Sequence, residues 1–172
     1  MKHLSGRILI AFVITTIVGA GLHFLYDFWP NWITALVSPV SESLWEHVKT
    51  IFFPLLAASL LLTRKESPGN RAPWLLSLIL VCVLMLAAGY VYHIFLSGET
   101  TAVDVAIYVI CMALGFVLPG FLAEPLGGRF VEPLSFLTAV MALLIIIFTF
   151  MPPELILFMD FSTVNTFRTI PY

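Results

Sequence analysis

Five long apolar segments constrain the fold of this chain more than any other feature. A helix needs about 20 mainly apolar residues to cross the hydrocarbon core of a membrane. The chain is 60% hydrophobic and only 10% charged, whereas a soluble domain carries about 25% charged residues. The apolar runs do not alternate as the strands of a membrane barrel do. The sequence therefore predicts an all-α integral membrane bundle of five helices in a single domain, residues 1–172, with spans at residues 7–26, 38–62, 73–96, 102–122 and 134–151.

The second span is the least regular of the five. Its purely apolar part, residues 51–62, is too short to cross a membrane. We therefore expect the helix to begin near Ser38 and Pro39, because Ser suits the N-cap and Pro suits the first helical position. This extension brings the polar stretch from Glu42 to His47 into the helix.

Two segments outside the spans are expected to lie at the membrane surface. Residues 28–37 are apolar but contain a Pro-Asn pair, which predicts a short segment along the interface between the first and second helices. Residues 152–172 follow a Pro pair that ends the last helix, and they are too apolar for a disordered tail. We expect this tail to fold over the outer face, with Asp160 nearest the polar residues there.

The charges of the loops predict the orientation of the bundle. Six of the eight basic residues precede the first span or lie in the loops after the second and fourth spans, which all fall on one side of the predicted membrane. Seven of the ten acidic residues fall on the opposite side of the membrane. The positive-inside rule then puts the N-terminus in the cytoplasm and the C-terminus outside. A formal net charge of −2 excludes a basic nucleic-acid-binding protein, and an acidic outer face favours cations.

Polar residues gather at the predicted outer ends of the helices, and three of the four histidines are among them. An adjacent Glu-His pair on the second span, with histidines from the first and third spans, offers nitrogen and oxygen ligands for zinc or another divalent metal. The predicted metal ligands are His23, His47 and His93; the predicted catalytic residues are Glu46 and Glu42; the predicted supporting residues are Tyr26, Lys49, Asp104 and Asp160. Glu46 would act as ligand or base, and Glu42 or Asp104 would orient an imidazole or act as the base.

Plainer interpretations compete with this site. An S-x-x-E pattern that ends at Glu46 fits a capping box, in which the carboxylate only bonds backbone at the start of its own helix. Glu42 would then be a solvated acid, His47 would face lipid headgroups, and His93 would belong to an aromatic belt at the interface. His23 resists this interpretation, because it lies inside an apolar run, where a histidine is expected to face the bundle and find a partner.

Two blocks of sequence resemble a family of small bacterial integral membrane proteins of unknown function. Residues 23–26 (HFLY) and 38–49 (SPVSESLWEHVK) are similar to its pattern H-F-x-Y followed by S-P-V-N-E-S-x-W-E-H-x-K, and residues 157–160 (LFMD) match a later L-F-x-D element. Ser41 stands where the family usually has Asn, and the usual T-G-x-Y-G ending is not evident. The resemblance implies a multi-pass protein of the bacterial plasma membrane with a shared site, and it implies no particular activity.

Three hypotheses for function follow, each with the lipid bilayer as a partner. The first is an outward-facing metal-dependent hydrolase or transferase that acts on a lipid or lipid-linked substrate. The second is a protein that binds or transports a cation or another small-molecule ligand, in which a homo-oligomer would provide the path. The third is a non-catalytic membrane subunit that docks a partner through its E-S-x-W-E-H segment. The sequence leaves open whether the protein is an enzyme.

Overall fold

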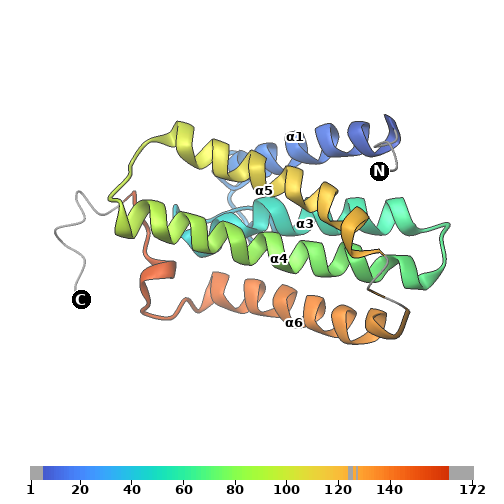
Figure 1. The fold of residues 1–172 in the computed structure, drawn as a ribbon. Coiled ribbons are helices and arrows are strands. Elements are labelled where there is room, and N and C mark those ends of the chain that lie inside the picture. Colours follow the sequence, from blue (N-terminus) through green and yellow to red (C-terminus); the bar gives the residue numbers. More distant parts are fainter. Residues whose placement is uncertain (1–5, 124–125, 127, 163–172) are drawn as a thin grey trace.

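Five long helices lie side by side in the computed structural model, which describes residues 6–123, 126 and 128–162. They are α1 (Gly6–Phe28), α3 (Leu44–Thr63), α4 (Arg71–Tyr90), α5 (Thr101–Leu122) and α6 (Val131–Phe150) (Figure 1). Five helical segments are long and apolar enough to cross a membrane, and the described residues contain no strand. The prediction of an all-helical chain with five membrane-compatible helices is therefore confirmed. Residues 163–172, the end of the predicted tail, lie outside the described residues.

Short elements join the long helices. The predicted interfacial segment contains the short helix α2 (Trp32–Val37), which begins after Asn31 because the Asn31 side chain accepts hydrogen bonds from the backbone N–H groups of Ile33 and Thr34. A position of α2 at a membrane surface stays a prediction. The other short elements are the 3₁₀ turns η1 (Pro68–Asn70), η3 (Gly128–Phe130) and η4 (Ile156–Phe158) and the π-helical turn η2 (Val91–Phe95), which continues α4.

Helix α3 forms the centre of the bundle, and α1 and α6 lie at its outside. In the most apolar stretch of α3, 56% of the residues are buried, against 11% in the corresponding stretches of α1 and α6. The core side chains Val48, Ile51, Phe52 and Leu55 of α3 are fully buried. The outward faces of α1 and α6 expose many large apolar side chains, a pattern that water disfavours and lipid accommodates. These features are typical of a multi-pass membrane protein.

Helix α3 begins at Leu44, not near Ser38 as predicted. Ser43 is the N-cap, and its hydroxyl oxygen accepts a hydrogen bond of 3.3 Å from the Glu46 N–H. The preceding residues are held outside the helix because Lys49 Nζ binds the Ser38 carbonyl and the Glu46 carboxylate accepts the N–H of Val40. The segment 38–43 is therefore a separate connection, so Glu42 does not share a helix face with Glu46 and Lys49.

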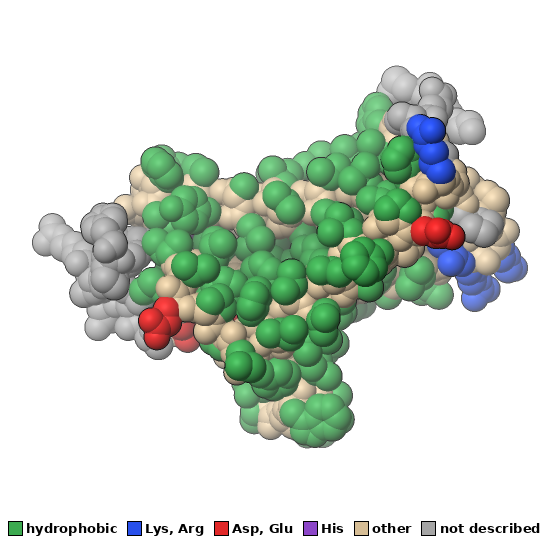
Figure 2. Space-filling view, turned by 90° about the horizontal axis from the view of Figure 1, so that it is seen from below, with side chains coloured by type: hydrophobic (Ala, Val, Ile, Leu, Met, Phe, Trp, Pro, Cys, Tyr) green, Lys and Arg blue, Asp and Glu red, His purple; other side chains and the backbone are tan. Residues whose placement is uncertain are grey.

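The two ends of the bundle differ in charge. Figure 2 shows apolar side chains over the middle of the molecule, Lys and Arg at one end, and Asp or Glu at both ends. We call the end where α1 and α6 finish and α3 and α5 begin the histidine end, because it contains all three described histidines. The loops at the opposite end, here called the basic end, contain or adjoin the basic residues Arg64, Lys65, Arg71 and Arg129.

Candidate metal centre

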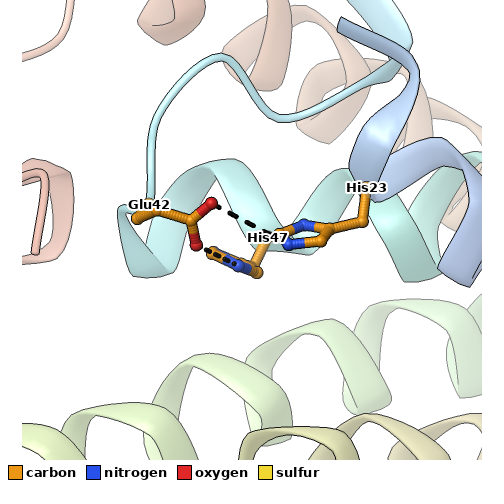
Figure 3. Close-up of side chains that lie close together, drawn as sticks. All are labelled: His23, Glu42 and His47. Carbon is orange, nitrogen blue, oxygen red and sulfur yellow. Dashed lines mark ion pairs between the residues drawn. The ribbon is translucent and has the colours of Figure 1, made fainter. Parts of the chain in front are cut away.

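Three potential metal ligands converge at the histidine end from three separate segments (Figure 3). His23 comes from the last turns of α1, Glu42 from the connection before α3, and His47 from the first turn of α3. The Nε2 atoms of His47 and His23 lie 3.2 Å and 3.8 Å from the two carboxylate oxygens of Glu42. One ligand atom of each residue lies within 4.8 Å of the others. Since zinc draws nitrogen and oxygen ligands to about 2.0–2.2 Å, modest side-chain movements would let all three bind one ion.

His47 is already oriented as a metal ligand would be. Its Nδ1 lies 2.7 Å from the backbone carbonyl oxygen of Ser43. A carbonyl only accepts hydrogen bonds, so Nδ1 must carry the proton in this bond. Metal-binding histidines usually donate their other ring N–H in this way, which fixes the ring and leaves Nε2 for the ion. The Nε2 atom of His47 accordingly faces Glu42.

His23 places a second imidazole beside that of His47. Its imidazole lies 5.1 Å from that of His47, measured between ring centroids. Its Nδ1 atom is buried and forms no hydrogen bond among the described residues. An unsatisfied buried polar atom costs about 1–3 kcal/mol, so each such atom in a native structure needs an explanation. The His23 nitrogen that lies near Glu42 is Nε2, so an ion bound there would leave Nδ1 as it is.

Glu42 makes the cluster accessible from outside the protein. Its side chain is 50% exposed, while both histidines are partly buried. The hydrogen bond with His47 holds the pKa of the Glu42 carboxyl below its ordinary value; partial burial opposes this shift, and the charges of His47 and His23 add to it. The carboxylate is therefore in its anionic, metal-binding form at neutral pH.

His93, the third predicted ligand, lies in a separate pair with Asp104. The His93 Nε2 is 2.8 Å from the Asp104 Oδ1, and its Nδ1 is 2.8 Å from the carbonyl oxygen of Gly98. The π-helical turn η2 presents His93 to the start of α5, and Phe161 from the tail stacks on its ring at 5.4 Å. The structure thus brings His23 and His47 together with Glu42, and it does not bring His93 into the same cluster.

Glu46 and Lys49 form a buried ion pair, with 2.6 Å between Glu46 Oε2 and Lys49 Nζ. The Glu46 carboxylate also accepts the N–H of Val40 at 2.9 Å and the hydroxyl of Thr149 at 3.1 Å. The Lys49 ammonium donates to the carbonyl of Ala35 as well. The predicted capping box forms only in part. The Ser43 hydroxyl accepts the Glu46 N–H, but the Glu46 carboxylate binds the N–H of Val40 and not that of Ser43. These contacts give both residues a structural role, and neither belongs to the cluster.

The remaining predicted residues lie around the cluster. Tyr26 donates its backbone N–H to the Ser38 hydroxyl. Asp160 accepts two hydrogen bonds from Ser162 and lines a cavity together with Glu46. Sequence reasoning missed Thr149, which bonds Glu46 across the bundle. A hydroxyl at the end of an otherwise apolar span was the one available signal.

The described part of the tail contacts residues at the histidine end. The Phe158 ring packs against Trp45 and Phe148, with ring centroids 5.1 and 5.2 Å apart. The Phe161 N–H lies 3.5 Å from the Glu42 carbonyl oxygen. The tail therefore contacts both the segment that carries Glu42 and the His93 ring. That this face lies outside a membrane stays a prediction.

The fold and the cluster together define a multi-pass, membrane-type helical bundle with a His/Glu group at one end. The chain belongs to a family of unknown function, DUF6512, whose model matches residues 1–166. No curated protein and no solved structure matches the chain. The resemblance inferred from the sequence blocks is confirmed at the level of a family of unknown function; the particular sequence pattern and a bacterial origin stay predictions.

Proposed function

We propose that His23, Glu42 and His47 bind a divalent metal ion, zinc or another transition metal, and that the ion serves an enzyme acting on a lipid or lipid-linked substrate. The observation that carries this proposal is the convergence of the three side chains from α1, the connection 38–43 and α3. Glu42 and His47 are close in sequence, but His23 comes from α1, so the chain must fold to assemble the group.

The donor set suits a catalytic ion better than a structural one. Two imidazoles and one carboxylate are ligands that zinc and related metals accept. Structural zinc sites are usually closed by four protein ligands, whereas catalytic sites keep a position open for water or substrate. A bound ion would polarise a carbonyl or phosphoryl group, or lower the pKa of a bound water. The hydrogen bond from His47 Nε2 to the ionised Glu42 carboxylate requires a proton on Nε2, because an ionised carboxylate only accepts. A metal ion that binds Nε2 would displace this proton.

The surroundings favour an amphiphilic substrate. The cluster lies at the end of helices whose outer faces are apolar, so a lipid could keep its chains beside the helices while its polar group reaches Glu42. Phe28, Trp29 and Trp32 follow the His23 turn and are 69–81% exposed. Aromatic side chains of this kind are typical of the level at which lipid headgroups lie.

A second candidate, binding or transport of a cation, has one observation in its favour. The histidine end has an excess of acidic residues, and its one described lysine, Lys49, is neutralised by Glu46. The described charged residues all lie near helix ends or in connections, which leaves the middle of the bundle without the ionisable groups that transport routes usually carry. We therefore rank catalysis ahead of transport. The docking hypothesis has no observation of its own.

Metal binding by the purified protein tests the proposal. We would measure zinc affinity by calorimetry and zinc content by elemental analysis in wild type, His23→Ala, His47→Ala and His93→Ala. We expect about one ion per chain in wild type. The first two variants remove a proposed ligand, so each should lose more than the roughly 10–100-fold in affinity that mutation of an outer-shell partner costs. His93→Ala is the matched control, because it removes a histidine from the same end but not from the cluster, and it should keep the ion.

Two further assays separate the candidate functions. Zinc-dependent turnover of ester- or phosphate-linked lipids, abolished by a chelator, would support the enzyme. Zinc flux into liposomes without turnover would support transport instead. No zinc binding, or equal loss in His93→Ala and His47→Ala, would overturn the metal site itself.

A further inference from the structure

Residues 28–37, which contain α2, expose an apolar surface beside the histidine end. Their most exposed large side chains, at 58–81%, are those of Phe28, Trp29, Trp32 and Ile33. Figure 2 shows an apolar projection from the side of the bundle, between its two charged ends. No charged residue occurs between Asp27 and Glu42. Helices that lie on a membrane surface usually carry a strongly charged or polar face, so this composition favours a more apolar environment than the surface.

The end of α2 lies beside the interior of the neighbouring helices and not beyond their ends. The hydroxyl of Ser38, the C-cap of α2, donates to the Leu22 carbonyl oxygen of α1. Leu22 lies six residues before the end of α1 at Phe28, which corresponds to about 9 Å along a helix axis. The Ala35 carbonyl accepts a hydrogen bond from Lys49, which lies five residues after the start of α3. The chain therefore leaves α1 at its end and returns to a level within the long helices.

Hydrogen bonds within the segment serve the backbone of the turn between α1 and α2. Asn31 Oδ1 accepts the N–H groups of Ile33 and Thr34, and Asn31 Nδ2 donates to the Trp29 carbonyl oxygen. The Thr34 hydroxyl donates to the same carbonyl oxygen and accepts the Asn31 N–H. A segment surrounded by hydrocarbon must satisfy its backbone groups internally, because lipid chains offer no hydrogen-bond partner. These bonds suit the turn to an apolar environment.

We propose that residues 28–37 form a re-entrant segment whose aromatic side chains contact lipid acyl chains just below the headgroups. The exposed apolar side chains, the return of the chain to the level of Leu22 and the internally bonded turn all fit this partner. The surface does not require the metal centre. One consequence rests on the proposed function: the segment follows the helix that carries His23 and precedes the connection that carries Glu42. An acyl chain held on the segment would therefore bring a lipid headgroup to the cluster.

Quenching of tryptophan fluorescence in liposomes tests the proposal on the full chain. The chain has four tryptophans, so Trp29→Phe, Trp45→Phe and Trp74→Phe together leave Trp32 as the one emitter. The matched control keeps Trp45 instead, which is partly buried and packs against two phenylalanine rings. The quenchers are phosphatidylcholine brominated near the top of its acyl chains, phosphatidylcholine brominated near their methyl ends, and iodide in the buffer.

We expect bromine near the top of the acyl chains to remove most of the Trp32 emission, bromine near the methyl ends to remove less, and iodide to remove little. The Trp45 protein should respond weakly to all three quenchers. Stronger quenching of Trp32 by iodide than by either brominated lipid would place the segment in water. Quenching by none of the three would mean that protein covers the segment. Either result overturns the proposal.

Asn31→Ala in the Trp32 protein should increase quenching by iodide, because backbone groups that lose the Asn31 side chain need water as a partner. Asn70→Ala is the matched control, since the Asn70 side chain donates to Glu66 at the basic end, and it should leave the quenching unchanged. An equal effect of the two variants would contradict the proposed insertion. Zinc affinity measured on the same samples shows whether the metal centre stands or fails separately.

Discussion

At the scale of single residues, the Glu46–Lys49 pair holds the segment that carries Glu42. The Lys49 ammonium donates to the carbonyls of Ala35 and Ser38 and to the Glu46 carboxylate, which in turn accepts the N–H of Val40. Glu46 and Lys49 of α3 therefore fix the end of α2 and the start of the connection 38–43 by hydrogen bonds. Glu42 is placed beside His47 by this attachment.

Lys49→Met should destabilise the protein strongly. Removing the ammonium leaves the Glu46 carboxylate buried without its counter-charge, which typically costs about 3–5 kcal/mol. The double variant Glu46→Gln/Lys49→Met should recover part of this loss, because a neutral amide can still accept from Val40 and Thr149. The free energy of unfolding in detergent checks both expectations. A Lys49→Met protein as stable as wild type would show that the pair is dispensable.

Glu42 makes stability depend on pH in the metal-free protein. Because its folded-state pKa lies below the ordinary value of 4.5, its ionised form stabilises the fold at pH values above 4.5. This contribution is lost as the pH falls through the lowered pKa. We expect the Tm difference between wild type and Glu42→Gln, measured with a chelator present, to be constant near neutral pH and to shrink in the acid range. A Tm difference that grows on acidification would contradict a lowered pKa of Glu42 in the folded protein.

The sequence predicted some site residues better than others. His23, Glu42 and His47 were recognised because ionisable groups inside or beside apolar helices need partners. Lys49 was predicted only as a supporting residue at the outer ends of the helices, and the structure buries it fully in the pair with Glu46. The i, i+3 spacing of Glu46 and Lys49 was compatible with an ion pair. The burial of that pair depends on how α2 and α6 pack against α3, which no local sequence pattern predicts. The separation of His93 from the cluster likewise depends on how η2 turns.

At the scale of elements, the approach of α1 to α3 decides whether His23 reaches His47. Gly19 permits this approach, because a side chain there would collide with the Thr50 carbonyl oxygen of α3 and the Tyr108 hydroxyl of α5. The Tyr108 hydroxyl also donates to the Thr16 carbonyl at 2.7 Å, which fixes α5 against α1. His23 lies one turn further along α1.

Gly19→Val should push α1 away from α3 and weaken metal binding without altering any ligand. Overpacking of this kind costs about 1–3 kcal/mol. Gly21→Val is the matched control, because a side chain at Gly21 has nothing within 4 Å. The zinc affinity and the Tm should both fall in Gly19→Val, and both should stay near the wild-type values in Gly21→Val. Equal behaviour of the two variants would contradict the proposed role of this contact.

The helices themselves were predictable, and their exact ends were less so. Long apolar runs predicted five helical spans because only helices and closed β-barrels satisfy backbone hydrogen bonds in lipid, and the runs do not alternate as barrel strands do. The start of α3 was placed near Ser38 since Ser and Pro often begin helices. Ser43 competes for the same role, and the side chains of Glu46 and Lys49, which bond the preceding connection, favour it.

At the scale of the whole molecule, the charge difference between the two ends predicts the orientation in the membrane. Lys65 lies in the loop at the basic end, and Glu99 lies in the connection at the histidine end. In a background without Cys82 and Cys111, we expect Glu99→Cys to react with an impermeant maleimide on intact cells. Lys65→Cys should react only after the cells are permeabilised. The opposite labelling pattern would place the histidine end in the cytoplasm.

The central claim, a metal ion held by His23, Glu42 and His47, is tested most directly by X-ray absorption at the zinc edge of the zinc-loaded protein. We predict a first shell of nitrogen and oxygen at about 2.0–2.2 Å that contains two imidazoles. His47→Ala should lose one imidazole or the ion, while His93→Ala should give the wild-type spectrum. Sulfur scattering at about 2.3 Å would instead place the ion on cysteine, and an identical spectrum for His47→Ala would contradict the proposed site.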